Sequence, residues 1–214
     1  MKKAIIFDLD GTLWDTMDQT YNSFNIVLKK HGYDEVTREK VFDNFGNNRD
    51  QAIKHFFPTL PYDVANRLID EVDDDINANL DKNDNLIYNG VKEALDLLSK
   101  KYELFIVSNN AHSSYIEGFL KAGNFNNHFK DYIAASEIPI SKSEAIQKII
   151  IDNKIDKAVY VGDTDKDKDS AEKNNIPFIQ CLYGFGKDLN CEYKINDISK
   201  LYNCVESIFE KTRW

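Results

Sequence analysis

Short apolar runs recur along the chain, and polar or turn-forming residues follow each of them. These runs occupy residues 2–8, 103–108, 131–136, 157–163 and 177–181. Runs of this length that are rich in isoleucine and valine are typical of buried strands in a parallel sheet. Helical spacing of apolar residues separates the later runs, at 116–120 and 146–150. The alternation predicts an α/β fold with a doubly wound, Rossmann-like parallel sheet.

The interval between the first two runs is too long for one crossover helix. Roughly ninety residues separate Asp8 from Glu103, several times the length of an ordinary connection. Two helical stripes lie inside it, formed by Met17, Tyr21, Phe24, Leu28 and His31, and by Val64, Leu68, Val72, Ile76 and Leu80. Residues 91–98 are predicted to be the true crossover helix, and the polar residues 80–90 a hinge. We therefore expect an all-helical cap domain at 15–85, inserted into a core domain of residues 1–14 and 86–214.

Candidate chemistry gathers where the predicted strands end. The polar residues at these points are Asp8 and Asp10, Ser108 and Asn109, Lys142, and Asp163. Ligands of open α/β sheets bind outside the carboxyl ends of the strands, so these side chains are expected to converge. Lys142 also stands at the start of a predicted helix that Ser141 and Glu144 can cap.

Aspartate occupies every second position from 163 to 169, a spacing that also occurs in calcium-binding loops. Such a loop needs glycine at its sixth position and glutamate at its twelfth, where this chain has Lys168 and Asn174. A calcium-binding loop of this kind also follows a helix, whereas the apolar run before Asp163 is predicted to be a strand. We therefore expect a strand-to-helix turn in which Asp163 faces Asp8 and Asp10, while Asp165 and Asp169 are solvated and balanced by neighbouring lysines.

Together these motifs resemble the haloacid dehalogenase-like (HAD) superfamily of phosphotransferases. The resemblance rests on D-x-D-G-T-L at 8–13, the Ser108-Asn109 pair, Lys142, and G-D-T-x-x-D at 162–167, in the family's order. The helical insertion and residues 177–186 resemble the C1-capped subfamily, which includes phosphoglycolate phosphatases. Two positions depart from the pattern: Ser143 stands where proline often follows the lysine, and Asn174-Asn175 replaces Ala-Gly. Lys148 and Lys154 are therefore rival candidates for the lysine.

The resemblance implies a role for each of these residues. Asp8 is expected to be the nucleophile and Asp10 the general acid and base, while Thr12, Ser108, Asn109 and Lys142 hold the phosphate. Mg²⁺ is expected to bind the side chains of Asp8 and Asp163 and the backbone carbonyl of Asp10. Asp167 is expected to order the turn and to support the metal from behind.

The resemblance implies a Mg²⁺-dependent phosphatase that hydrolyses a small phosphomonoester, of the phosphoglycolate or sugar-phosphate type, through an aspartyl-phosphate. A phosphomutase, a 2-haloacid dehalogenase and a non-catalytic regulatory module remain as alternatives. Asp10 argues against the dehalogenase, in which no leaving oxygen needs a proton.

Two further features lie in the predicted cap. Arg49 lies between two predicted cap helices and is a candidate for contact with the substrate. The acidic run at 70–75 is expected to be a solvated helix face.

The composition of the chain argues against some classes of binding partner and indicates a cellular compartment. The net charge of −9 argues against nucleic acids and anionic membranes, which leaves a small phosphorylated metabolite as the expected partner. Three cysteines without a C-x-x-C pair are typical of a reducing compartment. The apolar run after the first lysines is too short for a signal peptide. A cytoplasmic monomer or homodimer is expected.

Overall fold

The computed structural model describes residues 1–78, 84–109, 112–138 and 140–211. At its centre is a parallel sheet in the order β3-β2-β1-β4-β5-β6. The strands are β1 (Lys3–Phe7), β2 (Glu103–Ser108), β3 (Phe129–Ala134), β4 (Lys157–Gly162), β5 (Phe178–Cys181) and β6 (Tyr193–Ile195). Each of the five predicted runs overlaps a strand, and β3 begins two residues before its run. The short β6 was not predicted, because one buried residue among three provides no periodic pattern.

Side chains of the central strand alternate between two hydrophobic cores. Ile5 and Phe7 are fully buried in one core, and Ala4 and Ile6 in the other. In register, Ile6 lies opposite Phe105 of β2 and Tyr160 of β4, so apolar residues continue across the sheet. Burial on both faces explains why the four residues after Lys3 in β1 are all apolar.

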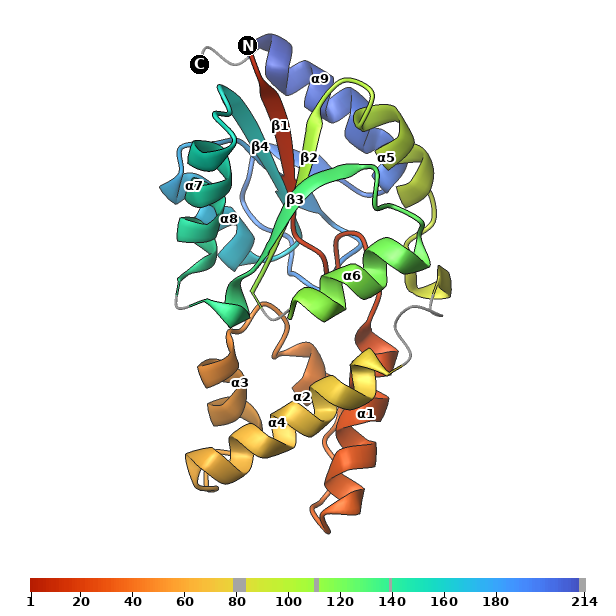
Figure 1. Cartoon of the computed structure of the whole chain (residues 1–214), viewed down its shortest axis with the longest axis vertical. Coiled ribbons are helices and arrows are strands. Elements are labelled where there is room, and N and C mark those ends of the chain that lie inside the picture. Colours follow the sequence, from red (N-terminus) through yellow and green to blue (C-terminus); the bar gives the residue numbers. More distant parts are fainter. Residues whose placement is uncertain (79–83, 110–111, 139, 212–214) are drawn as a thin grey trace.

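Helices cover both faces of the sheet (Figure 1). One face carries α7 (Lys142–Asp152) and α8 (Asp165–Lys173), and the other carries α5 (Val91–Leu98), α6 (Ser113–Ala122) and α9 (Leu201–Lys211). The predicted crossover helix is α5, which buries the four apolar residues expected of it. The prediction of a doubly wound α/β fold is therefore confirmed.

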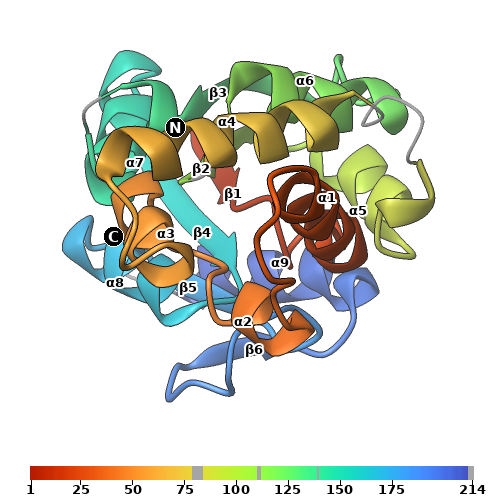
Figure 2. The ribbon, with the colours of Figure 1, turned by 90° about the horizontal axis from the view of Figure 1, so that it is seen from below.

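Four further helices form a separate layer at the carboxyl end of the strands (Figures 1 and 2). They are α1 (Met17–Lys30), α2 (Arg38–Phe42), α3 (Arg49–Phe56) and α4 (Tyr62–Asn77). Met17, Phe24 and Leu28 of the first predicted stripe are buried, as are Leu68, Val72 and Ile76 of the second. Leu80 lies outside the described residues. The layer therefore has its own apolar contacts and faces the strand ends, where the candidate site lies.

The two connections between this layer and the sheet run side by side. Trp14 forms an antiparallel bridge with Ile87, and the backbone N–H of Asp15 donates to the carbonyl of Leu86 at 2.7 Å. Trp14 is fully buried, with Tyr115 packed on it at a ring distance of 5.4 Å. Of the predicted hinge at 80–90, residues 80–83 lie outside the described residues. The hinge and the division into two domains stay predictions.

None of the helices in the described ranges combines the length and the apolar character that a membrane span requires.

Candidate active site

Lys142 joins two buried carboxylates at the centre of the site. Its Nζ donates to Oδ1 of Asp8 at 2.7 Å and to Oδ1 of Asp167 at 2.6 Å. Burial alone lowers the pKa of the lysine, but Asp167 and Asp8 outweigh it and raise the pKa well above its usual value. Burial raises the pKa of Asp8 well above its usual range, and the charge of Lys142 opposes that rise. The ammonium of Lys142 thus compensates the buried negative charge of Asp8 and Asp167, which would otherwise be costly to bury.

Capping boxes position both the lysine and Asp167. Lys142 is the first residue of α7. The Ser141 hydroxyl accepts a hydrogen bond from the backbone N–H of Glu144, and the Glu144 carboxylate accepts one from the backbone N–H of Ser141. The predicted cap is therefore confirmed. At α8 the same motif pairs Thr164 with Asp167. Such local hydrogen bonds fix where each helix starts, and thereby fix where the first side chains of the helix lie.

All the oxygens of Asp167 are occupied. Oδ2 accepts from the backbone and hydroxyl of Thr164 at 2.9 and 2.7 Å, while Oδ1 accepts from Lys142. Burial raises the pKa of Asp167, but the Lys142 charge and these donors outweigh it and lower the pKa below its usual value. Asp167 is therefore an ionised residue that orders its neighbours.

Asp163 has one satisfied oxygen and one free oxygen. Its Oδ2 accepts from the backbone N–H groups of Phe185 and Gly186 at 2.6 and 3.0 Å. Its Oδ1 is buried and has no hydrogen-bond partner among the described residues. Burial, with a smaller contribution from Asp167, raises the pKa of Asp163 to about 7. A buried acceptor without a donor is costly unless a cation binds it.

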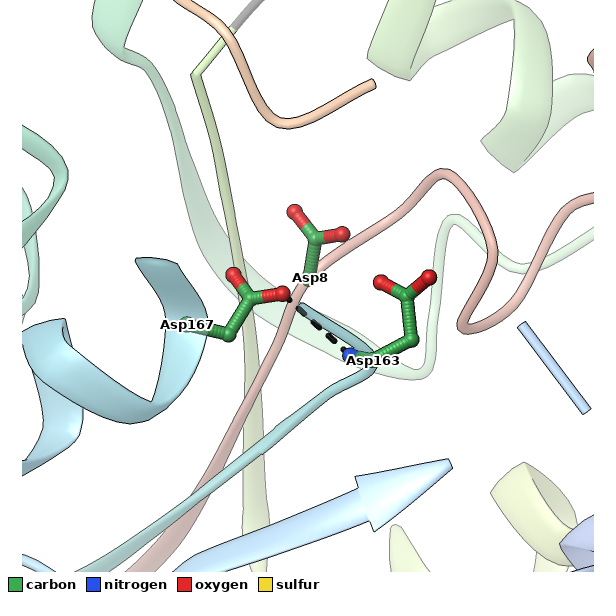
Figure 3. A group of neighbouring side chains, drawn as sticks. All are labelled: Asp8, Asp163 and Asp167. Atoms are coloured by element: carbon green, nitrogen blue, oxygen red, sulfur yellow. Dashed lines mark hydrogen bonds between the residues drawn. The ribbon is translucent and has the colours of Figure 1, made fainter. Parts of the chain in front are cut away.

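Ligand oxygens of Asp8, Asp163 and Asp167 lie within 4.8 Å of one another (Figure 3). A cluster of hard carboxylate oxygens fits Mg²⁺ or Ca²⁺ better than a softer metal. Gly11, with φ of +75°, lies against Asp163 so closely that a Cβ would collide with its carboxylate. The residues present therefore fit a small divalent cation, with the orphaned Oδ1 of Asp163 as the clearest indication.

Asp10, which was expected to converge with Asp8 and Asp163, lines a small cavity together with Asp8, but its side chain is not part of this group of three carboxylates. The group that the structure brings together contains Asp167 instead. Oδ1 of Asp10 accepts from the hydroxyl of Thr16 at 2.7 Å and from that of Tyr115 at 2.5 Å. Burial raises the pKa of Asp10, and these two donors oppose the rise. The carboxyl group is therefore held beside the cluster, on the side of the helical layer.

The expected phosphate ligands divide into two groups. A small cavity of about 10 Å³ is lined by Asp8, Asp10, Ser108, Asn109, Lys142 and Thr164, together with Phe45 and Gly46 of the helical layer. Ser108, at the end of β2, is only 2% exposed. Thr12 is fully buried, does not line this cavity, and has a hydroxyl with no partner among the described residues. Its role in binding phosphate stays a prediction.

The Arg49 side chain is bound to helix α4. Its guanidinium donates to Oδ1 of Asn66 at 2.8 Å, to Oδ2 of Asp73 at 3.0 Å, and to Asp70. Asp73 is thus no member of a solvated face, and that expectation was wrong for this residue. Arg49 still lines a cavity next to Asp10, and its contact with substrate stays a prediction.

A model of the family described as haloacid dehalogenase-like hydrolase matches residues 5–181. The chain belongs to this family. The predicted family and its hydrolase class are therefore confirmed. The HAD motifs named above contain Asp8, Lys142, Asp163 and Asp167, which form the site just described.

Curated relatives of this HAD chain are similar over nearly their whole length. A phosphoglycolate phosphatase of Rhodobacter capsulatus is 26% identical, with 96% of this chain and 98% of the relative aligned. That of Vibrio parahaemolyticus is 25% identical, covering 95% and 96%. That of Synechococcus elongatus is 27% identical, covering 86% and 85%.

Solved HAD structures share the fold at lower identity. A predicted phosphoglycolate phosphatase from Haemophilus somnus has a TM-score of 0.84 at 20% identity, covering 95% of this chain and 98% of its own. A β-phosphoglucomutase from Clostridium difficile has a TM-score of 0.80 at 16% identity, covering 99% and 98%. At such identities the likeness shows the fold alone, and both a phosphatase and a mutase share it.

The two departures from the HAD pattern contact each other. Nδ2 of Asn174 donates to the carbonyl and to the hydroxyl of Ser143 at 2.9 and 3.1 Å. Asn175 adopts the left-handed conformation, with φ of 54°. The rival Lys148 is exposed and pairs with Asp152. Within the described residues, Lys142 is therefore the lysine that reaches the acidic cluster.

Sequence reasoning missed Tyr115, Phe185 and Gly186 of this HAD site. Tyr115 has no motif, since it lies in an ordinary amphipathic helix. The glycines at 184 and 186 were a usable signal, because both crowd Asp163 so tightly that no side chain fits. The exposed Asp165 and Asp169 were predicted correctly, but Lys166 binds Asn47 and Lys168 pairs with Glu172.

Proposed function

We propose that this hydrolase is a Mg²⁺-dependent phosphatase that cleaves a small phosphomonoester through an aspartyl-phosphate on Asp8. One observation carries the proposal: the buried, unpartnered Oδ1 of Asp163 lies in the same cluster as Asp8, which Lys142 holds. The cluster thus supplies a carboxylate that can act as nucleophile, an ammonium that can stabilise phosphoryl oxygens, and an oxygen that can bind a cation. The similarity to phosphoglycolate phosphatases supports the same class.

Mg²⁺ would be held by the side chains of Asp8 and Asp163 and by the backbone carbonyl of Asp10. When bound, it supplies positive charge that reduces the repulsion between an anionic phosphate and an anionic nucleophile. Asp167 stays out of this set because Lys142 and Thr164 occupy its oxygens. It keeps Lys142 charged and fixes the turn that carries Asp163.

Asp8 attacks the phosphorus atom, and the bond from phosphorus to the ester oxygen breaks. Asp10 gives its proton to the departing alkoxide, which leaves as an alcohol. Water then attacks the phosphorus, Asp10 takes a proton from that water, and the bond between Asp8 and phosphorus breaks. Inorganic phosphate leaves and both aspartates return to their initial states.

The remaining polar groups act on the phosphoryl oxygens. Nζ of Lys142 lies 2.7 Å from Oδ1 of Asp8. The ammonium is therefore close to the phosphoryl oxygens, on which negative charge builds up during the attack. Ser108 and Asn109 line the same small cavity. The cavity of about 10 Å³ holds roughly one water, so the helical layer must move before a phosphoryl group enters. Such a lid also excludes bulk water once it closes.

The test is hydrolysis of an aryl phosphate by the purified protein, first in EDTA and then with Mg²⁺ or Ca²⁺ restored. We expect activity to disappear in EDTA and to return with Mg²⁺ alone, because Ca²⁺ prefers more ligands at longer distances. Equal activity in EDTA would reject the metal assignment. Phosphoryl transfer to an added sugar phosphate in place of water would indicate a phosphomutase instead.

A further inference from the structure

A second cavity is lined mainly by residues of the helical layer and is closed on the other side by Asp10, His112 and Tyr115. Its volume is about 90 Å³, several times what one water needs, so it accommodates a small organic group. Asp10 and Phe45 line both this cavity and the small cavity beside Asp8. The phosphoryl group belongs beside Asp8, and Asp10 protonates the leaving oxygen. The group attached to that oxygen therefore extends past Asp10 into the larger cavity.

The charges around this cavity are already paired. Among its described lining residues the cationic candidates are Arg49 and His112. Arg49 donates to Asp73 at 3.0 Å and also binds Asp70, and Nε2 of His112 lies 3.8 Å from Asp73. Nδ1 of His112 lies 3.5 Å from Glu137. Both side chains thus have acidic partners, and Asp73 itself lines the cavity.

A negatively charged leaving group would be poorly accommodated here. Burying a carboxylate is costly unless a cation or several donors compensate it. Four of the five N–H groups of Arg49 already donate to Asn66, Asp70 and Asp73. Such a group could therefore accept at most one further hydrogen bond from Arg49, and it would do so beside the like charge of Asp73. Phosphoglycolate, the substrate in the names of the curated relatives, carries a leaving group of this kind.

The rest of the wall is mostly apolar, with a few neutral polar residues, namely Thr20, Asn44, Asn77 and Tyr115. The apolar part consists of Phe24, Val41, Phe45, Ala52, Ile69, Val72 and Ile76. Asn77 also lines the cavity, and its Oδ1 is buried without a partner among the described residues. Asp73 adds further acceptor oxygens. These surroundings match carbon atoms together with a hydroxyl or amino donor.

We propose that this cavity receives the leaving group, and that the leaving group is a non-anionic alcohol with apolar carbons and a hydrogen-bond donor. The inference rests on the proposed phosphatase function and narrows its substrate class. Asp73 is the specificity determinant, because it keeps Arg49 from binding an anion.

A series of phosphomonoesters of similar size tests which charge on the leaving group the cavity accepts. Phosphoglycolate, 2-hydroxyethyl phosphate, 2-aminoethyl phosphate and propyl phosphate differ mainly in the terminal group, which is anionic, hydroxyl, ammonium or methyl. Phosphate release gives kcat/KM for each, and competition with aryl phosphate hydrolysis gives the inhibition constant of each. We expect phosphoglycolate to be about tenfold or more poorer than the hydroxyethyl or aminoethyl ester by either measure. Propyl phosphate should fall below the better of these two.

Two variants in helix α4 test the role of Asp73 in substrate specificity. Asp73→Asn removes the cavity carboxylate and frees a donor of Arg49, so phosphoglycolate should improve relative to 2-hydroxyethyl phosphate by at least about fivefold. Asp74→Asn makes the same change of net charge, but Asp74 is exposed and does not line the cavity. Its substrate ratio should equal that of the wild type.

The outcomes separate the two proposals. Mg²⁺-dependent aryl phosphate hydrolysis with a preference for phosphoglycolate would overturn the substrate class and leave the phosphatase function standing. An unchanged ratio in Asp73→Asn would overturn the role of Asp73. A preparation that hydrolyses no phosphomonoester at all would overturn the proposed function and this inference with it.

Discussion

The hydroxyl group of Tyr115 donates a 2.5 Å hydrogen bond to Oδ1 of Asp10, the oxygen that also accepts from Thr16. Tyr115 belongs to α6 and packs on the buried ring of Trp14. Its pKa is raised well above the usual value, first by burial and then by Asp10, so it remains a donor at neutral pH. Tyr115, on helix α6, thus fixes the position of the proposed general acid, which lies in the connection between β1 and α1.

Tyr115→Phe should lower kcat for an alkyl phosphate by about tenfold or more, the loss typical of one hydrogen bond to a charged group. An aryl phosphate has a leaving group that needs little protonation, so its kcat should change much less. Tyr132→Phe is the matched control, because its hydroxyl binds Glu117 on the surface. Equal losses on both substrates would mean that Tyr115 supports the fold and not Asp10.

Asp8→Asn should abolish turnover and leave no covalent phosphate on the protein, because the nucleophile is missing. Asp10→Asn should slow turnover severely while Asp8 can still be phosphorylated. Rapid-quench measurement with a good leaving group checks both variants. A phosphoenzyme in both, or in neither, would contradict this division of roles.

Lys142→Ala should lower kcat by roughly 10²- to 10³-fold, the scale of one preorganised contact to the transition state. It also leaves Asp8 and Asp167 as uncompensated buried charges, so the melting temperature should fall as well. Lys148→Ala should change neither quantity appreciably, because the salt bridge that this lysine forms among the described residues is an exposed pair with Asp152. The reverse pattern would reject Lys142 as the phosphate ligand.

Mg²⁺ should raise the melting temperature of the wild type, since an ion that binds only the folded state stabilises it. Asp163→Asn should remove most of that rise, because the variant loses the charged, unpartnered oxygen. Asp169→Asn is the control for charge on the exposed surface. A full rise in Asp163→Asn would place the ion elsewhere.

The pH dependence of stability should reveal Asp73. Burial raises its pKa to about 6 despite Arg49 and His112, so between about pH 4 and 6 the folded chain holds a proton that the unfolded chain has lost. Stability from this group therefore falls as pH rises through that window. Asp73→Asn should gain stability relative to the wild type from pH 4 to pH 7, measured by denaturant unfolding. Asp74→Asn should show no such trend.

The sequence by itself determined the features that depend on neighbouring residues. Continuous apolar runs located the five longer strands, and their ends located Asp8, Ser108 and Asp163, because parallel strands deliver their carboxyl ends to one edge. Ser141 and Glu144 marked the start of α7 and so favoured Lys142 over Lys148. Periodicity and capping act within a few residues, so a single sequence contains them in full.

Only the tertiary structure decided which distant groups meet. Tyr115 reaches Asp10 across 105 positions, and the N–H of Phe185 reaches Asp163 across 22. Arg49 was expected to be a candidate for substrate contact, and only the packing of the helical layer shows that α4 brings Asp73 to it. These contacts depend on how layers and loops pack in three dimensions. No local pattern encodes that packing, because the same amphipathic helix can present its polar face to solvent or to a neighbour.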